Sequence, residues 1–192
     1  MLMKQARAML APVSQIQVMA LYSIINENNL WEKQISIKRN EFLVEENTIN
    51  QNLFFVIDGS LKISCIIDNE EQIIRLGYPN SFLTALDSFL NNSPTKYSIT
   101  AIKSATLKSI SKNKLLHFLE KNQLQNIWIN VLNTLILQQN EREIDLLTTS
   151  AKDRYEGVLK RSPKLFQNIP QKYIANYLRV SPETLSRLMK KS

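Results

Sequence analysis

Residues 169–191 read IPQKYIANYLRVSPETLSRLMKK, and this stretch predicts two short helices joined by a tight turn. The small side chain of Ala175 lets a second helix approach the first closely. Residues 178–180 form the connection. Ser181 followed by Pro182 is a helix start signal, because serine caps the first turn and proline suits its first position. The pattern is typical of a helix-turn-helix motif.

The second of these helices carries a polar stripe at helical spacing, which suits the major groove of DNA. Arg187 can donate two hydrogen bonds to guanine O6 and N7, and Glu183 can accept one from cytosine N4. The alternative is an exposed ion pair between these two side chains, which contributes little. The residues expected to face DNA bases are Ser181, Pro182, Glu183, Ser186, Arg187 and Lys190. Those expected to contact phosphates are Lys172, Tyr173, Arg179 and Lys191.

The positive charge of the chain is concentrated near its C-terminus. The 192 residues carry a net charge of +7, and residues 150–192 hold ten Lys or Arg against three acidic residues. Residues 1–149 are therefore neutral. A basic surplus confined to one small segment indicates contact with a phosphate backbone, although a solvated basic tail would have the same composition.

The part of the chain before this motif is rich in short strands. Residues 14–30 have helical spacing, and β-branched and aromatic runs then alternate with turn residues such as Asp58-Gly59. Many short strands at close spacing predict a sandwich or barrel. The expected strands include 53–57, 61–67, 72–76, 97–102 and 105–110.

Helices follow the strands. We expect Ser111 to cap a helix over Lys112–Lys121, and a further helix over 150–161 to end at Ser162-Pro163. Between them, residues 123–147 contain almost no turn residues and predict one long helix with a heptad-like apolar seam. We expect this seam to pair with a second copy of the chain; packing within the same chain is the alternative. The seam residues are Leu124, Ile127, Trp128, Val131 and Leu135.

The composition excludes several classes of function. A single Cys and a single His leave no material for disulfides, for zinc or iron–sulfur sites, or for a Cys-His dyad. The sequence shows no nucleophile–base pair and no metal constellation, so we expect neither an enzyme nor a cofactor. It also has no long apolar segment and no signal peptide, and we expect a soluble, cytoplasmic protein without a membrane partner.

In the order of its elements the chain resembles the Crp–Fnr family of bacterial transcription regulators. The resemblance is carried by Asp153-Arg154-Tyr155, by residues 169–175 and by residues 181–187, which look especially like the short Bacteroidetes members. It implies an α+β fold with an N-terminal double-stranded β-helix or jelly-roll sensor domain of the cyclic-nucleotide-binding type over residues 1–122. A dimerisation helix over 123–147 and a winged-helix-like, all-α DNA-binding domain over 148–192 complete the expected organisation. The implied partners are double-stranded DNA, a second copy of the chain and RNA polymerase.

The sequence departs from the family where cyclic AMP would bind. The Gly-Glu pair of the family's phosphate and ribose site is replaced by Thr84 and Ala85, and Thr95 or Lys96 stands near the position of its arginine. A cyclic phosphate needs a fixed cation and the ribose needs a carboxylate acceptor. Control by cyclic AMP is therefore not expected, and the effector is left unknown.

Three further departures concern the backbone and the C-terminus. Asn40 and Asn47 stand where relatives carry turn glycines, and asparagine tolerates the left-handed conformation. Arg179 stands where the motif usually has glycine, and the sequence ends at Ser192, which leaves no residues for a wing hairpin. The sequence predicts a homodimeric, sequence-specific DNA-binding regulator. The alternative is a ligand-binding or protein-interaction module whose basic C-terminus binds DNA nonspecifically.

Overall fold

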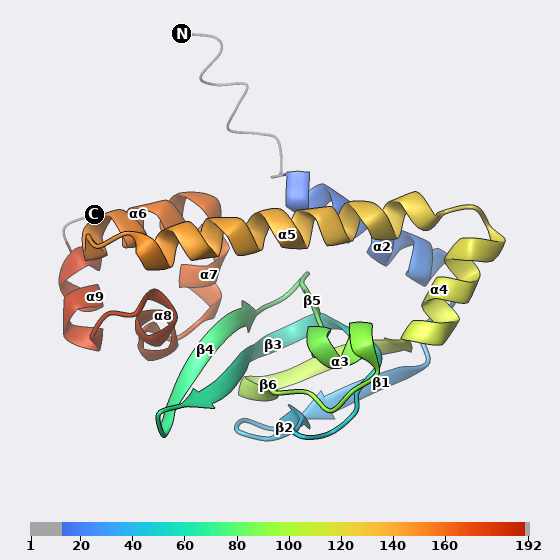
Figure 1. The fold of residues 1–192 in the computed structure, drawn as a ribbon, viewed down its shortest axis with the longest axis horizontal. Helices are drawn as coiled ribbons and strands as arrows, with labels where there is room; N and C mark the ends of the chain where they lie inside the picture. The colour runs from blue at the N-terminus through green and yellow to red at the C-terminus, as the bar shows by residue number, and fades with distance from the viewer. Residues whose placement is uncertain (1–12, 191–192) are drawn as a thin grey trace, which may run out of the picture.

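The computed structural model describes residues 13–190, with side chains described from residue 16. Six antiparallel strands form one curled sheet, in which β1, β6, β3 and β4 are neighbours in that order (Figure 1). The short strand β2 pairs with β6 and β5 pairs with β3. The strands are β1 (Lys33–Ile37), β2 (Phe42–Val44), β3 (Asn52–Ile67), β4 (Glu70–Gly77), β5 (Phe82–Leu83) and β6 (Ser98–Ser111). This β-domain confirms the predicted fold class.

Two strands are longer than the sequence indicated. The predicted strands 53–57 and 61–67 are parts of β3, and those at 97–102 and 105–110 are parts of β6. Asp58-Gly59 is therefore not a turn between strands. The register of β3 against β6 shifts around Asp58 and Ser60, and Gly59 has a φ of +87°. Extra residues of this kind let a strand bend sharply without ending.

Asparagines supply most of the left-handed turns of the β-domain. Asn40 and Asn47 have φ values of 67° and 62°, which is the left-handed conformation that the sequence predicts for them. Both turns are held by backbone hydrogen bonds. The amide of Asn40 donates to Ala101 O over 2.8 Å, and that of Asn47 donates to Thr95 O over 2.8 Å.

Among residues 13–190, four helices flank the β-domain: α2 (Val13–Glu27), α3 (Leu86–Asn91), α4 (Lys112–Lys121) and α5 (Gln125–Leu147). Helix α4 has the predicted bounds, but Ser111 does not cap it with its side chain. Its amide and its hydroxyl donate instead to the carboxylate of Glu32, over 2.5 and 3.2 Å. Helix α5 runs along the top of the molecule, from the β-domain to the C-terminal helices (Figure 1).

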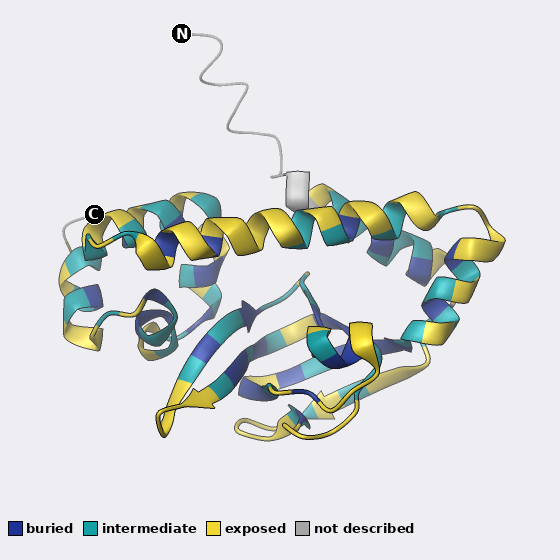
Figure 2. Cartoon of the chain, in the orientation of Figure 1, coloured by how far each residue is buried: buried dark blue, intermediate teal, exposed yellow. Residues whose placement is uncertain are grey.

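The C-terminal helices are α6 (Ala151–Arg161), α7 (Pro163–Asn168), α8 (Gln171–Leu178) and α9 (Pro182–Met189). Helix α6 ends before Ser162-Pro163 as predicted, but Pro163 then opens α7, which the sequence reading did not anticipate. Proline ends one helix and suits the first position of the next. Buried residues run along the strands and through these helices, whereas much of α5 is exposed (Figure 2).

One apolar core joins the C-terminal helices to the β-domain. It contains Ile73 and Leu76 of β4 and Ile102 of β6, together with buried residues of α6 to α9 such as Ile174 and Leu185.

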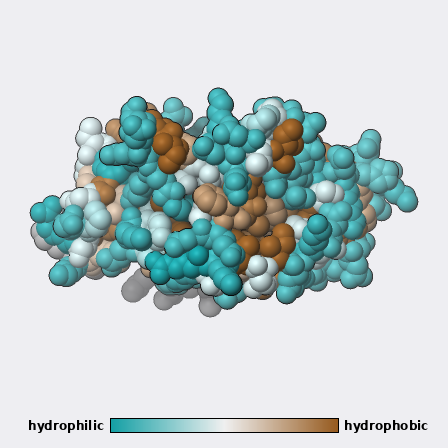
Figure 3. Space-filling model, turned by 90° about the horizontal axis from the view of Figure 1, so that it is seen from below, coloured by the Kyte–Doolittle hydropathy of each residue, from teal (hydrophilic) through white to brown (hydrophobic). Residues whose placement is uncertain are grey.

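The lower face of the molecule is mainly hydrophilic, with some hydrophobic side chains gathered near its middle (Figure 3). Among residues 13–190, no helix is long and apolar enough to cross a membrane, and no cluster of His, Cys, Asp or Glu could hold a metal ion.

Candidate nucleic-acid interface

The turn between α8 and α9 has the geometry that the sequence predicts. Arg179 adopts the left-handed conformation, with φ 55° and ψ 47°, and the amide of Val180 donates to Ala175 O over 3.0 Å. The hydroxyl of Ser181 accepts from the amide of Thr184 over 3.1 Å and so caps α9. Leu185, on the inner side of α9, is fully buried and anchors the helix to the core.

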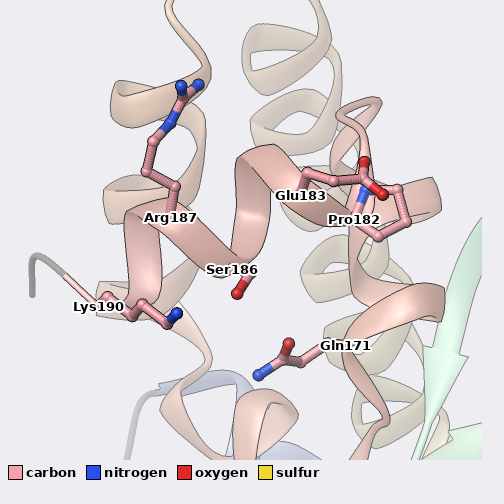
Figure 4. A pocket seen from close by; sticks show the side chains of 6 residues that line it. All are labelled: Gln171, Pro182, Glu183, Ser186, Arg187 and Lys190. Atoms are coloured by element: carbon pink, nitrogen blue, oxygen red, sulfur yellow. The ribbon is translucent and has the colours of Figure 1, made fainter.

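The outer side of α9 is polar and exposed. Glu183, Arg187 and Lys190 are exposed and Ser186 is half-buried. Among the described residues no ion pair joins Glu183 to Arg187, and the two side chains point apart (Figure 4). The alternative given by the sequence, an ion pair between Glu183 and Arg187, is therefore not formed in the described structure. The hydrogen-bonding groups of both side chains face outward (Figure 4).

A groove along α9 adds one residue that the sequence analysis did not single out. It is lined by Pro182, Glu183, Ser186, Arg187 and Lys190 of the α9 segment, and by Gln171 from the start of α8. The Gln171 carboxamide, the Ser186 hydroxyl and the Lys190 ammonium point towards one another across it (Figure 4). The sequence feature that could have indicated Gln171 is its position directly after Pro170, in the first turn of α8. A residue there can lie beside the helix that follows.

Of the four expected phosphate contacts, the three that the structure describes have different surroundings. Lys172 is exposed, and its ammonium lies 4.7 Å from the centre of the Tyr173 ring. Tyr173 is half-buried and packs on the core shared with the β-domain. The guanidinium of Arg179 donates to the side chain of Gln72 on β4. Lys191 lies outside the described residues.

A carboxylate of the chain itself lies in the stretch where the resemblance implies a cyclic-nucleotide site, residues 84–96. Asp87, in the first turn of α3, accepts from the Thr95 hydroxyl over 2.7 Å and from the amides of Ser88 and Lys96 over 2.8 Å each. Partial burial raises the pKa of Asp87, but the hydrogen bonds from Lys96, Thr95 and Ser88 outweigh it and leave the pKa below its ordinary value. The Thr95 hydroxyl and the Lys96 amide thus have an internal acceptor.

Thr84 and Ala85, the other two positions of that implied site, have structural roles. The hydroxyl of Thr84 donates to Asn52 O over 3.0 Å, and Ala85 is completely buried before α3. Sequence reasoning missed Asp87 because its partners lie eight and nine residues along the chain, across a loop. The only signal was an acidic residue at the start of a short helix.

The predicted seam of α5 faces the chain's own β-domain. Leu124, Ile127, Trp128, Val131 and Leu135 all belong to the apolar core formed with α2, α4 and the sheet. The Trp128 ring lies 5.6 Å from the ring of Phe89, and Val131 is 6% exposed. Packing within the same chain, the alternative left open by the sequence, is what these side chains do here.

Apolar residues on the opposite side of α5 are exposed. Ile129, Ile136 and Leu147 lie about whole numbers of turns apart, and 49%, 59% and 75% of their surfaces are accessible. Ile144 is also exposed and lies beside this line. A helix stripe of this kind is unusual on a surface that stays in water.

Comparison with known proteins finds a family match for the β-domain and similar structures for the whole fold. Residues 34–122 match the family model of the cyclic nucleotide-binding domain. A search of curated proteins finds no sequence that matches the chain. A solved structure of a CooA mutant from Carboxydothermus hydrogenoformans is similar at 15% identity, with a TM-score of 0.67 over 89% of this chain and 83% of that one.

Two further structures resemble the chain over most of its length. FixK2 from Bradyrhizobium japonicum is 17% identical, with a TM-score of 0.66 over 83% of each chain. The c-di-GMP-responsive global regulator CLP from Xanthomonas campestris is 15% identical, with a TM-score of 0.62 over 88% of this chain and 89% of that one. At these identities the likeness establishes a shared fold.

Proposed function

We propose that this chain, which has the fold of the Crp–Fnr transcription regulators, is a homodimeric regulator that binds DNA in a sequence-specific way and is not controlled by cyclic AMP. The observation that carries the proposal is the outer side of α9. Its polar side chains stand exposed on a helix that Ser181 caps and Leu185 anchors. A rigid helix with outward hydrogen-bonding groups is what base reading in a major groove requires.

Arg187 and Glu183 would read bases. A guanidinium matches O6 and N7 of guanine, and a carboxylate accepts from N4 of cytosine. Because no ion pair holds these two side chains together in the described structure, neither has to be released before it contacts DNA. Lys190, Ser186 and Gln171 line the groove beside them and would contact the neighbouring backbone or bases.

The exposed stripe of α5 supports a homodimer. Ile129, Ile136 and Leu147 would lie against the same residues of a second copy, and this seam replaces the one that the sequence predicted. Two α9 helices related by a two-fold axis would enter successive major grooves about 34 Å apart. The expected operator is therefore nearly palindromic.

Asp87 supports independence from cyclic AMP. Its carboxylate accepts from the Thr95 hydroxyl and the Lys96 amide, and an incoming phosphate would meet a like charge there. Ala85 also provides no carboxylate for a ribose.

The decisive experiment is selection of bound duplexes from a random pool at about 150 mM salt, where nonspecific phosphate binding is weak. We expect a two-fold-symmetric motif. Arg187→Ala should lose preference at one base position of each half-site, with about 5- to 150-fold weaker discrimination there. The control is Arg39→Ala, which removes the same charge from an exposed turn of the β-domain.

Two results would contradict the proposal. Binding that falls steeply with salt and enriches no motif would indicate the alternative function, nonspecific attraction of DNA to a basic domain. A motif that keeps its full specificity in the Arg187 variant would show that α9 does not read bases through this residue.

A further inference from the structure

We infer that Asn176 is a positioning residue. Its side chain fastens α8 to the outer edge of β4 and thereby sets the spacing at which two recognition helices meet DNA. The inference rests on the proposed function and adds to it. The residues that touch DNA would lie on α9, whereas Asn176 acts from the other side of α8 on the orientation of the pair.

The contact is a two-point hydrogen bond to a strand backbone. Oδ1 of Asn176 accepts from the amide of Ile73 over 2.9 Å, and Nδ2 donates to Glu71 O over 2.9 Å. Within the described residues β4 pairs with β3 alone, so its other edge presents unpaired amides and carbonyls. A carboxamide carries one acceptor and two donors in a plane, like a peptide group, and completes this edge as another strand would.

The apolar contact around Asn176 holds the domains together but does not fix their register. Ile73 and Leu76 of β4 share one core with Ile174 and Leu178 of α8. Burial of apolar surface is non-directional, so this core tolerates sliding or rotation of α8 along the strand. Hydrogen bonds have preferred lengths and angles, and the pair made by Asn176 selects one arrangement.

The remaining links to β4 and β6 are weaker constraints. Arg179 donates to the side chain of Gln72, and the Lys103 ammonium donates to Asn168 O over 3.0 Å. Each uses a long side chain with several rotatable bonds. A flexible group of this kind permits a range of orientations, whereas the short side chain of Asn176 does not.

The orientation of α8 determines that of α9, and both orientations matter relative to α5. The turn at residues 179–181 is held by the Val180–Ala175 hydrogen bond and by the capped start of α9, so α8 and α9 move as one unit. Residues 148–150 connect α5 to α6, and α5 also contacts the C-terminal helices directly, since Arg142 donates to Tyr177 O of α8 and Asp145 accepts from Arg161 of α6 over 3.1 Å. The proposed dimer surface lies on α5. Because α8 is bonded both to α5 and to β4, the distance between the two α9 helices depends on both contacts, and Asn176 fixes the one to β4.

The test compares spacings on DNA. The selected half-sites are placed at their preferred separation and at separations changed by one and two base pairs, and Kd is measured for each duplex. A change of two base pairs rotates one half-site by about a fifth of a turn. We expect Asn176→Ala to weaken the discrimination between preferred and shifted spacings by about tenfold, which corresponds to about 1.4 kcal/mol. Its base preference within each half-site should stay unchanged.

Two further variants make the result specific. Asn168→Ala removes an asparagine of the same domain whose amide bonds only to Lys164 O of its own helix, and it should keep the wild-type spacing profile. Asn176→Asp keeps the size of the side chain but cannot donate to Glu71 O, and it should relax the profile if Asn176→Ala folds poorly. Hydrogen exchange at the Ile73 amide should be faster in Asn176→Ala, whereas the carboxylate of Asn176→Asp can still accept from that amide and should leave its exchange close to that of the wild type.

The possible outcomes separate this inference from the proposed function. If the wild-type protein selects no motif, the proposed function fails and the inference fails with it. If it selects a motif and the Asn176 variants keep the wild-type spacing profile, the positioning role is wrong while the proposed function stands. Faster exchange at Ile73 without a change in spacing would likewise overturn the inference, since the contact would then be structural only.

Discussion

Gly59 meets two restrictions at once in the bend of β3. Its φ of +87° lies in the region that L side chains rarely adopt. A Cβ built there would also lie 2.2 Å from Ser104 O and 2.5 Å from the Ala105 Cα of β6. Because both obstacles are backbone atoms, a side chain at this position would push the two longest strands of the sheet apart.

Replacing Gly59 by alanine should therefore destabilise the protein by about 2–4 kcal/mol, through backbone strain and overpacking. Gly157→Ala provides an informative contrast, since Gly157 lies inside α6 and its nearest neighbours would be 3.7 Å from the new Cβ. Alanine there should stabilise by about 0.5–1 kcal/mol. Urea unfolding of both variants measures the two shifts, and an equal loss in each would refute the argument about the bulge.

At this scale the sequence predicts backbone behaviour better than partners. Asn40 and Asn47 were recognisable because few residues other than glycine tolerate a left-handed turn. Ser181 and Pro182 were recognisable because a cap is a local pattern. The partners of Asp87 could not be recognised, since its hydrogen bonds with Thr95 and Lys96 depend on how residues 93–97 fold back over α3.

The short helix α3 and the loop behind it form an element whose stability depends on pH. At neutral pH the Asp87 carboxylate accepts three hydrogen bonds from Ser88, Thr95 and Lys96. They leave its pKa below the ordinary value of an aspartate, so the ionised form stabilises the fold. This contribution is complete above the ordinary carboxyl range and is lost as the pH falls through the pKa of the folded state.

Asp87→Asn should therefore lower the free energy of unfolding by about 1–2 kcal/mol at neutral pH, because one acceptor becomes a donor that faces other donors. The difference from the wild type should stay constant from pH 7 to about pH 5 and shrink below about pH 4. Chemical denaturation across this range tests it, with Asp58→Asn as the control in the β-domain. A difference that grows on acidification would mean that Asp87 is not stabilised as a carboxylate.

Element boundaries followed the sequence where a local stop signal exists. Helix α4 has its predicted bounds, and α6 ends where Ser162 precedes proline. The long strands β3 and β6 were divided in two by the prediction, because residues such as Asp58-Gly59 have the same chemistry in a bulge as in a turn. Only pairing with the neighbouring strand distinguishes the two.

The orientation of α5 belongs to the scale of the whole molecule. Its sequence is apolar on two sides, and a heptad-like seam at Leu124, Trp128 and Val131 matches both a coiled coil and an internal core. The side of α5 that faces inward is decided by its packing against α2 and α4. Helix α2 lies far from α5 in the sequence, and α4 precedes it directly. The pattern therefore predicted a long helix correctly, but the choice of its buried side required the fold.

Dimerisation through the outer side of α5 leads to the final prediction. Ile136→Lys places a charge in the middle of the exposed stripe, where it would be buried against its own copy in the dimer. The variant should sediment as a monomer at concentrations where the wild type is dimeric. Because Ile136 is 59% exposed in the single chain, we expect little effect on the fold of the protomer itself.

A matched control separates the dimer surface from hydrophobicity in general. Ile66, near the end of β3, is also 59% exposed, and Ile66→Lys should leave the dimer intact. Val131→Ala, on the inner side of α5, should instead reduce the stability of the protomer by about 1–3 kcal/mol through the cavity it leaves. On DNA, the Ile136 variant should bind a palindrome no more tightly than a single half-site. A dimer that survives Ile136→Lys and dissociates with Val131→Ala would place the interface on the side of α5 that the sequence first indicated.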